Sequence, residues 1–433
     1  MKRFFPPIAG DRSTRIATLV TILALATVPV GCGKNAPTGP TSRSAAPLDA
    51  GALARKPVSV DSRVVVSLAP TADVFTIAAD HSAKVVTELG FGLAVLQPIG
   101  NQDPVRLVAE LERDAGVVAA EIDGLFETPE GRQVSVAFDD GDGTPEEIST
   151  QPAGLTVGFA AAHAVSRGAG IRIAILDTGA SGTHPVLAGR IADGWDFVGG
   201  DPDPSEEANG KDDDRDGFID ESAGHGTHVA GIIATGAPDA QLLIARVLDA
   251  DGRGDFANVA AGVRWALDRG ARVINLSLGG VRGSNIVQDA LEAAESTGVV
   301  CVSSAGNWGS DKPEEFPAKS SHVAAVAAVD AGNAPASFSS FAGYVAVSAP
   351  GVAIRSSYLD GRYASWSGTS MAAPFVSATA ALLVSIHPNW DLRLVMMRIG
   401  NTASPVVTSD AVLAEKFGAG VLDAAAALAP DAP

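Results

Sequence analysis

The sequence predicts an α/β protein whose main domain is a parallel β-sheet covered by helices on both faces. Two observations support this prediction. Short runs that are apolar throughout recur in the second part of the chain, and helical stretches separate several of them. A strand that is apolar on both sides must be buried on both sides, as in a parallel sheet between two helix layers. With 433 residues, 46% of them hydrophobic, the chain can form a large core.

The apolar runs predict five strands of this sheet, with two helices among them. The strands are expected over 171–177, 240–249, 271–280, 298–307 and 322–330, and the helices over 258–270 and 285–298. A further helix, apolar on all sides and therefore buried, is expected from Ser370 to Ile386. In such sheets ligands bind beyond the carboxyl ends of the strands, so polar residues there are candidates for chemistry.

A smaller α+β unit is expected before this domain, over 58–128. Its strands are predicted over 63–68, 91–98 and 117–123, with a helical stretch reaching about Leu89 and a second helix over 103–116. The unit contains no residue cluster suited to chemistry. An acidic stretch with Gly and Pro, 129–152, predicts an exposed linker of the kind that proteases cut. The main domain is then expected over 153–430.

The N-terminus, 1–32, predicts an export signal. Basic residues precede an apolar run that is short for a membrane span. The run ends in Gly and Cys32, which resembles a bacterial lipobox and implies a lipid anchor at Cys32, although Pro29 stands where the pattern prefers leucine. The polar, Pro-rich stretch 33–57 predicts a tether. We therefore expect an exported protein, either a cell-envelope lipoprotein or a secreted one.

The charge and the second cysteine narrow the possible partners. The formal net charge is −19, and nearly all of the acidic excess follows residue 128. Phosphate binding needs a basic surface, so the charge argues against nucleic acid as a partner. Cys301 lies in an apolar run and is expected to be an inert core residue. We expect a monomer.

Four polar residues are candidates for catalysis because each lies at a predicted strand end or helix start: Asp177, His225, Asn307 and Ser370. Each has an ordinary explanation alone, as a turn former, a core histidine, a loop amide or an N-cap serine. Together they supply a nucleophile, a base, a carboxylate that orients the base and a donor for an oxyanion.

The segments "ILDTG", "HGTHVAG", "SSAGN" and "SGTSMAAP" resemble the four signature segments of the subtilisin-like serine proteases, the subtilases. The chain order Asp, His, Ser also matches, and the resemblance covers roughly 153–430. It implies that Asp177 orients the imidazole and that His225 is general base and then general acid. Ser370 is then the nucleophile, and Asn307 and the Ser370 backbone amide donate to the oxyanion.

The resemblance also implies segments that bind an extended peptide or protein substrate. The residues implied to pair with the peptide are Ser277, Leu278, Gly279, Gly280, Gly252 and Gly254. Those implied to line the pocket for the side chain before the cut bond are Ser303, Ser304 and Ala305. His184 and His228 are expected to be structural.

An acidic insert predicts structural calcium. Asp212, Asp214, Asp216 and Asp220 match the first nine positions of a calcium loop, but position twelve is Ala223, so the loop is no EF-hand. Residues 193–221 contain 12 acidic and only 2 basic residues, and the carboxylates repel one another unless a cation is bound. The insert resembles calcium-binding inserts of subtilases, and the alternative is a solvated acidic loop.

The unit 58–128 resembles the small ferredoxin-like inhibitory prodomain of subtilases. The resemblance implies that it assists folding and occupies the active site until the enzyme cuts within 129–152; the alternative is a retained accessory domain. The predicted function is an exported, self-processing serine endopeptidase. The alternatives are a surface-anchored peptide-binding or calcium-stabilised scaffold with latent catalysis, and a narrow leader-peptide processing protease.

Overall fold

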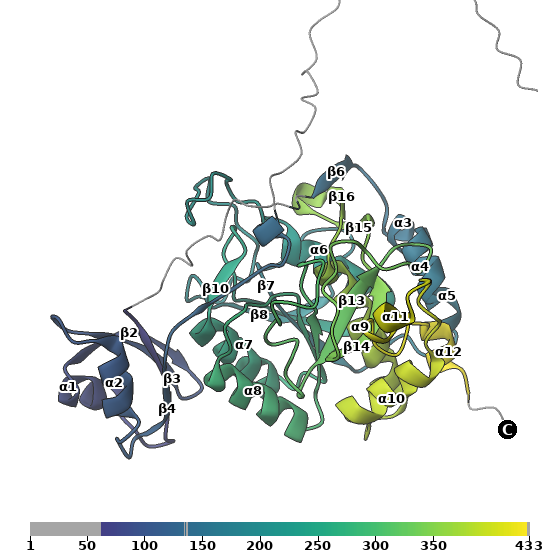
Figure 1. Cartoon of the computed structure of the whole chain (residues 1–433). Coiled ribbons are helices and arrows are strands. Elements are labelled where there is room, and N and C mark those ends of the chain that lie inside the picture. The colour runs from purple at the N-terminus through teal and green to yellow at the C-terminus, as the bar shows by residue number, and fades with distance from the viewer. Residues whose placement is uncertain (1–61, 134, 136, 431–433) are drawn as a thin grey trace, which may run out of the picture. The chain divides into compact units, whose positions relative to one another are not determined.

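A computed structural model describes residues 62–430 of the chain, except 134 and 136 (Figure 1). The predicted export signal, Cys32 and the tether lie outside the described residues.

Seven parallel strands form the main sheet, in the order β14-β13-β12-β11-β7-β9-β8. They are β7 Arg172–Asp177, β8 Ile191–Asp196, β9 Gln241–Arg246, β11 Val273–Leu276, β12 Val300–Ser304, β13 Ala324–Val329 and β14 Val345–Pro350. The predicted fold class is confirmed, and so are the five predicted strands. The edge strand β8 was not predicted because it is partly exposed and has no continuous apolar run. The edge strand β14 was not predicted either.

Both faces of this sheet are buried under helices. On β7, Ile173 and Ile175 face the core that the sheet forms with α6 (His225–Gly236) and α9 (Thr369–Ile386). Ala174 and Leu176 face the opposite core, formed with α7 (Phe256–Asp268) and α8 (Asn285–Ser296), which lie side by side (Figure 1). The alternation of side chains across the pleat therefore fills two cores from one strand.

Cys301, on β12, belongs to the second of these cores and is fully buried as a free thiol. Burial raises the pKa of the thiol to about 12. The prediction of an unreactive core cysteine is confirmed by this environment.

The first part of the described chain is a four-stranded antiparallel sheet with two helices. Its elements are β1 Val64–Leu68, α1 Val74–Asp80, β2 Ala83–Gly90, β3 Leu93–Pro98, α2 Pro104–Leu111 and β4 Val117–Ile122, in the sheet order β2-β3-β1-β4. The prediction of a helix reaching Leu89 was wrong. The helix ends at Asp80, Ser82 turns the chain with a φ of 53°, and the next residues pair with β3 as a strand.

The stretch 129–152 is not the exposed linker that its composition predicted. Glu130 is fully buried, and Ile148 is 3% exposed. After a 3₁₀ turn at Gly131–Gln133, the chain forms β6 and α3. The strand β6 pairs with β16, so this stretch is packed against the main domain.

The remaining elements connect and cover the sheets. They are β5 Leu125–Glu127, β6 Phe138–Gly141, α3 Pro145–Thr150, α4 Pro152–Val157, α5 Phe159–Ala162, β10 Arg253–Asp255, β15 Ile354–Ser357, a 3₁₀ turn at Leu359–Gly361, β16 Tyr363–Trp366, α10 Leu392–Thr402, α11 Ala411–Glu415 and α12 Ala424–Leu428. Among the described residues, α9 alone is long and apolar enough to cross a membrane, and it is a buried core helix.

Close packing of α6 gives the first testable prediction. A Cβ on Gly231 would lie 2.2 Å from Ser357 Oγ and 2.4 Å from Ser356 Oγ. Gly231→Ala is expected to lower the free energy of unfolding by about 1–3 kcal/mol, because the overpacking outweighs the helix propensity of alanine.

Urea denaturation in a Ser370→Ala background measures this change without self-digestion. Gly343→Ala is the control, since a Cβ there meets no atom within 4 Å. Equal stability of both variants would contradict the prediction.

Candidate active site

The fold brings the four predicted catalytic residues together at the carboxyl ends of the strands. Asp177 is the last residue of β7, and Asn307 follows β12. The helices α6 and α9 begin at His225 and Thr369, and Ser370 is in the first turn of α9. Asp177, His225 and Ser370 are fully buried, and Asn307 is 4% exposed. The order of the strands therefore gathers residues that are far apart in the sequence.

Asp177 holds the imidazole of His225. The distance between Asp177 Oδ1 and His225 Nδ1 is 2.7 Å. The same Oδ1 accepts a hydrogen bond from the Thr178 backbone N–H at 2.8 Å. On its other side the imidazole meets the Trp366 ring edge to face, with a centroid distance of 5.3 Å. The carboxylate and the indole together fix the plane of the ring.

Asn307 is oriented by the residue before Ser370. Its Oδ1 accepts hydrogen bonds from the Thr369 backbone N–H at 3.0 Å and from Thr369 Oγ1 at 2.9 Å. Its Nδ2 is therefore left to donate into the site, where the Ser370 backbone N–H also points at the start of α9. This arrangement provides two donors and a helix N-terminus for one anionic oxygen.

A residue that sequence reasoning missed, Glu130, fills this position. Its Oε2 accepts a hydrogen bond from Ser370 Oγ at 2.6 Å and lies 3.2 Å from His225 Nε2. Its Oε1 accepts from Asn307 Nδ2 at 2.9 Å and from the Ser370 N–H at 3.4 Å. No local signal marks Glu130, because it lies in a stretch whose composition predicted a linker.

The glycine before α9 makes room for this carboxylate. A Cβ on Gly368 would lie 1.6 Å from Glu130 Oε1. Any side chain at Gly368 would therefore exclude an anionic group from the space in front of Ser370.

The charges of Glu130 and His225 depend on each other. Burial opposes a charge on His225, but Asp177 and then Glu130 outweigh it and raise its pKa to about 10. Burial would raise the pKa of Glu130, but His225, Ser370 and Asn307 hold it below its usual value. His225 is thus a cation between two carboxylates. The stabilisation of the folded state by the protonated imidazole is complete below the ordinary histidine pKa of 6.5. It is lost as the pH rises through about 10.

The residues before Glu130 lie along the edge of the site as an added strand. The strand β5 pairs antiparallel with β10, with Phe126 opposite Gly254. The Glu127 N–H donates to Gly279 O at 3.0 Å, and the Thr128 N–H donates to Gly252 O at 2.9 Å. Three of the four glycines predicted to pair with a peptide substrate, Gly252, Gly254 and Gly279, thus pair with this chain's own segment.

The other predicted substrate-binding residues are mostly buried. Ser277 Oγ donates to Ser370 O at 3.0 Å, and the Gly280 N–H donates to Phe316 O at 2.8 Å. Leu278, Ser303, Ser304 and Ala305 have no exposed surface.

The two remaining histidines of the region bind backbone carbonyls. His228 Nε2 donates to Ile354 O and Ala364 O, both at 3.0 Å. Burial, then the charge on His225, lowers its pKa to about 3. His184 Nε2 donates to Arg362 O at 2.9 Å. Both contacts fit the structural roles expected for these histidines.

A further carboxylate, Glu206, was also missed. It accepts hydrogen bonds from the backbone N–H groups of Gly224 at 2.8 Å and Thr227 at 3.1 Å, and from Thr178 Oγ1. Glu206 therefore ties the acidic insert to the first turn of α6 and to the residue after Asp177. The usual sequence signal for a helix cap is an Asp, Asn or Ser directly before the helix. Glu206 lies far upstream of the start of α6, so it provides no such signal.

The acidic insert brings three of the four predicted calcium ligands together. Oxygens of Asp212, Asp214 and Asp216 lie within 4.8 Å of one another. Asp220 is not in this group, because its carboxylate accepts from the Asn209 N–H at 3.0 Å and the Gly210 N–H at 2.7 Å. Asp220, at position nine of the calcium-loop pattern, therefore does not join the other three aspartates as the pattern predicted.

Glu221 is the additional acid beside this group. Its Oε2 is buried without a hydrogen-bond partner. Burial, then the nearby aspartates Asp216, Asp251 and Asp214, raises the pKa of Glu221 to about 7. A cation would neutralise these carboxylates, and oxygen donors of this kind suit calcium.

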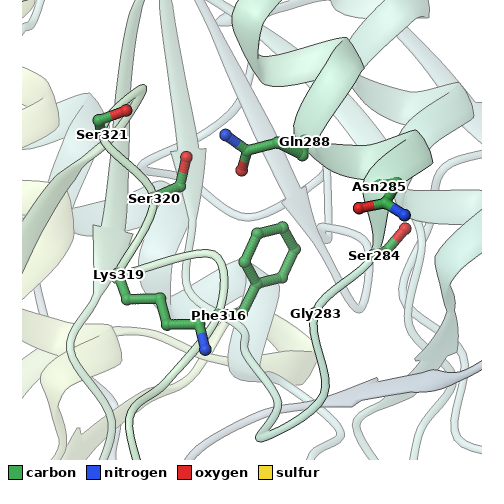
Figure 2. Close-up of a pocket in the computed structure, with 8 residues that line it drawn as sticks. All are labelled: Gly283, Ser284, Asn285, Gln288, Phe316, Lys319, Ser320 and Ser321. Carbon is green, nitrogen blue, oxygen red and sulfur yellow. The ribbon is translucent and has the colours of Figure 1, made fainter.

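A separate cavity of about 550 Å³ contains none of the four candidate catalytic residues (Figure 2). It is lined by Gly283, Ser284, Asn285, Gln288, Phe316, Lys319, Ser320 and Ser321. Figure 2 shows the Phe316 ring between Lys319 and Gly283. The candidate active site, at the carboxyl ends of the strands, is instead occupied by residues 125–132.

Comparison with known proteins agrees with the geometry. The model of the subtilase family, Peptidase_S8, matches residues 168–420. Thermitase from Thermoactinomyces vulgaris is 44% identical over 231 residues, which cover 51% of this chain and 77% of thermitase. Subtilisin BL from Lederbergia lenta is 38% identical over 269 residues, 60% of this chain and 91% of that protein.

A solved structure is also similar. It is fervidolysin from Fervidobacterium pennivorans, described as a keratinolytic enzyme related to subtilisin, with 25% identity and a TM-score of 0.66. The match covers 86% of this chain and 61% of fervidolysin. The family match spans more than half of the chain, and the chain therefore belongs to the subtilase family of serine endopeptidases.

Proposed function

We propose that the chain is the precursor of an exported endopeptidase that cleaves peptide bonds through an acyl-enzyme and processes itself. Ser370 Oγ attacks the substrate carbonyl, and His225 Nε2 takes its proton and later gives it to the leaving amine. Asp177 keeps His225 in the required tautomer and stabilises the imidazolium. Asn307 Nδ2 and the Ser370 N–H donate to the oxyanion, the place where Glu130 Oε1 now lies.

The observation that carries this proposal is the strand β5, which pairs with β10 and Gly279 beside the candidate active site. An extended peptide running beside Gly252, Gly254 and Gly279 is held by backbone hydrogen bonds, so many sequences can bind there. Such a strand leads directly to Ser370, as a substrate of an endopeptidase must.

The same observation supports self-inhibition of the precursor. Glu130 takes up the proton donors of Ser370 and Asn307, and it keeps His225 protonated. A protonated imidazole cannot act as a general base. The unit 58–128 is then an inhibitory prodomain that positions β5 and Glu130, and the cut falls within 129–152.

Calcium is proposed for the acidic insert, held by Asp212, Asp214 and Asp216 with Glu221 beside them. The ion would neutralise the insert and so keep Glu206 in place against the start of α6. Its role is structural, and none of the catalytic steps involves it.

Removal of the nucleophile tests the peptidase function and the processing together. Wild-type protein and Ser370→Ala, both made without the export signal, are compared by intact mass. Wild type is expected to be cut within 129–152, whereas Ser370→Ala stays whole. Cleavage of both at the same bond would mean that another protease made the cut, and two intact chains in calcium at neutral pH would favour a latent scaffold.

Removal of the Glu130 charge tests the inhibitory contact. In Ser370→Ala protein, Glu130→Gln is expected to lower the pKa of His225 from about 10, because a negative partner of the imidazolium is lost. The measurement is a pH titration of the histidine ring by ¹⁵N NMR. Glu112→Gln, at an exposed position, is the control. An unchanged pKa would show that Glu130 does not face His225 in solution.

Calcium removal tests the acidic insert. A chelator is expected to lower the melting temperature, and calcium at about 100 times its Kd stabilises by roughly 2.7 kcal/mol. Asp214→Asn is expected to abolish most of this calcium dependence. Glu292→Gln, on α8, is the control and should keep it. An unchanged melting temperature after addition of the chelator would contradict the prediction of a stabilising ion.

A further inference from the structure

A second buried carboxylate, Glu315, lies beside the candidate active site without a place in the proposed mechanism. It has no exposed surface. One of its oxygens accepts a hydrogen bond from Trp308 Nε1 at 2.7 Å, and the other accepts from Arg132 Nη1 at 2.6 Å. A buried carboxylate is costly unless it is paired, so its partner matters for the energy of this pocket.

The carboxylate lies between the two strand ends that flank Ser370. A Cβ on Gly279 would lie 2.5 Å from Glu315 Oε1, and a Cβ on Gly306 would lie 3.1 Å from Oε2. Gly279 pairs with Glu127 of β5, and Gly306 immediately precedes Asn307. Glycine at both positions leaves space for Glu315, which with the Gly279 carbonyl and the Trp308 ring forms what we call the Glu315 pocket.

Arg132 fills that pocket in the described chain. Besides its bond to Glu315, its Nη2 donates to Gly279 O, and its guanidinium carbon lies 5.5 Å from the centroid of the Trp308 ring. The pocket thus offers a carboxylate, a carbonyl and an aromatic face to one guanidinium group. Charge-assisted pairing with a carboxylate and stacking on an aromatic face are contacts that suit a guanidinium group.

We infer that Glu315 makes this peptidase selective for a basic side chain, arginine above all, at the residue before the cleaved bond, and that Arg132 occupies the pocket as an internal stand-in. The inference rests on the proposed function and adds the substrate class to it. Lysine binds less well because it cannot contact Glu315 and Gly279 O with one planar fork. A neutral side chain such as phenylalanine leaves Glu315 buried without its cationic partner.

The test measures kcat/KM of the processed enzyme on three peptides that differ in one residue, Arg, Lys or Phe before the cut bond. Wild type is expected to prefer Arg over Phe by roughly 100-fold, the usual effect of leaving one partner of a buried charge pair alone. Glu315→Gln is expected to lose most of this ratio, and largely by slower cleavage of the Arg peptide. Glu314→Gln is the matched control, because the Glu314 side chain is 45% exposed and pairs with Lys312.

A merely structural role for Glu315 would lower cleavage of all three peptides equally and leave the ratio unchanged, which overturns the inference. If Glu315→Gln does not fold, inhibition of wild type by a peptidyl argininal and by its phenylalaninal counterpart decides instead. Tighter inhibition by the argininal supports the inference, and equal or weaker inhibition overturns it. Cleavage of casein separates the two proposals: casein cut without preference for Arg rejects only the selectivity, and casein left intact rejects the peptidase function as well.

Discussion

The burial of both faces of one parallel sheet is the constraint on which the rest of this structure depends. Each central strand supplies side chains to two cores, and the helices α6 and α9 are held against one of them. Polar groups inside these cores must pair with one another, as Ser377 Oγ does with Asn275 Oδ1 at 2.8 Å, whereas the carboxyl ends of the strands can hold polar groups that face a ligand. The carboxyl ends of β7 and β12 and the starts of α6 and α9 therefore meet in one place, where the helix N-termini favour an anion.

In the described chain, Glu130 is that anion. A single imidazole, His225, lies between its carboxylate and that of Asp177, and the three groups are almost cut off from water. Under the proposed function, the electrostatic arrangement that would stabilise a reaction intermediate stabilises the precursor instead. Activation would then require the loss of the Glu130 carboxylate, after which the proton affinity of His225 falls towards that of a general base.

The pocket at Glu315 extends the same principle from the reaction to recognition. Arg132 follows Glu130 by two residues, so one short turn places an anion at the nucleophile and a cation in the adjacent pocket. Gly368 makes room for Glu130, and Gly279 and Gly306 make room for Glu315, the partner of Arg132. The segment 125–132 therefore pairs through its backbone with the residues around the site, and through its charges with His225 and Glu315.

The sequence by itself determined the fold class and the four residues at the sheet edge, because apolar runs and turn motifs are local signals. It did not determine the strand β2, since pairing with β3 outweighed the helical pattern of those residues. Only the tertiary structure decided that Glu130 meets Ser370, that Arg132 meets Glu315, and that the Asp220 carboxylate binds the backbone N–H groups of Asn209 and Gly210. The contacts of Glu130, Arg132 and Glu315 join groups whose charges become decisive only after burial removes water, and no local pattern records that step.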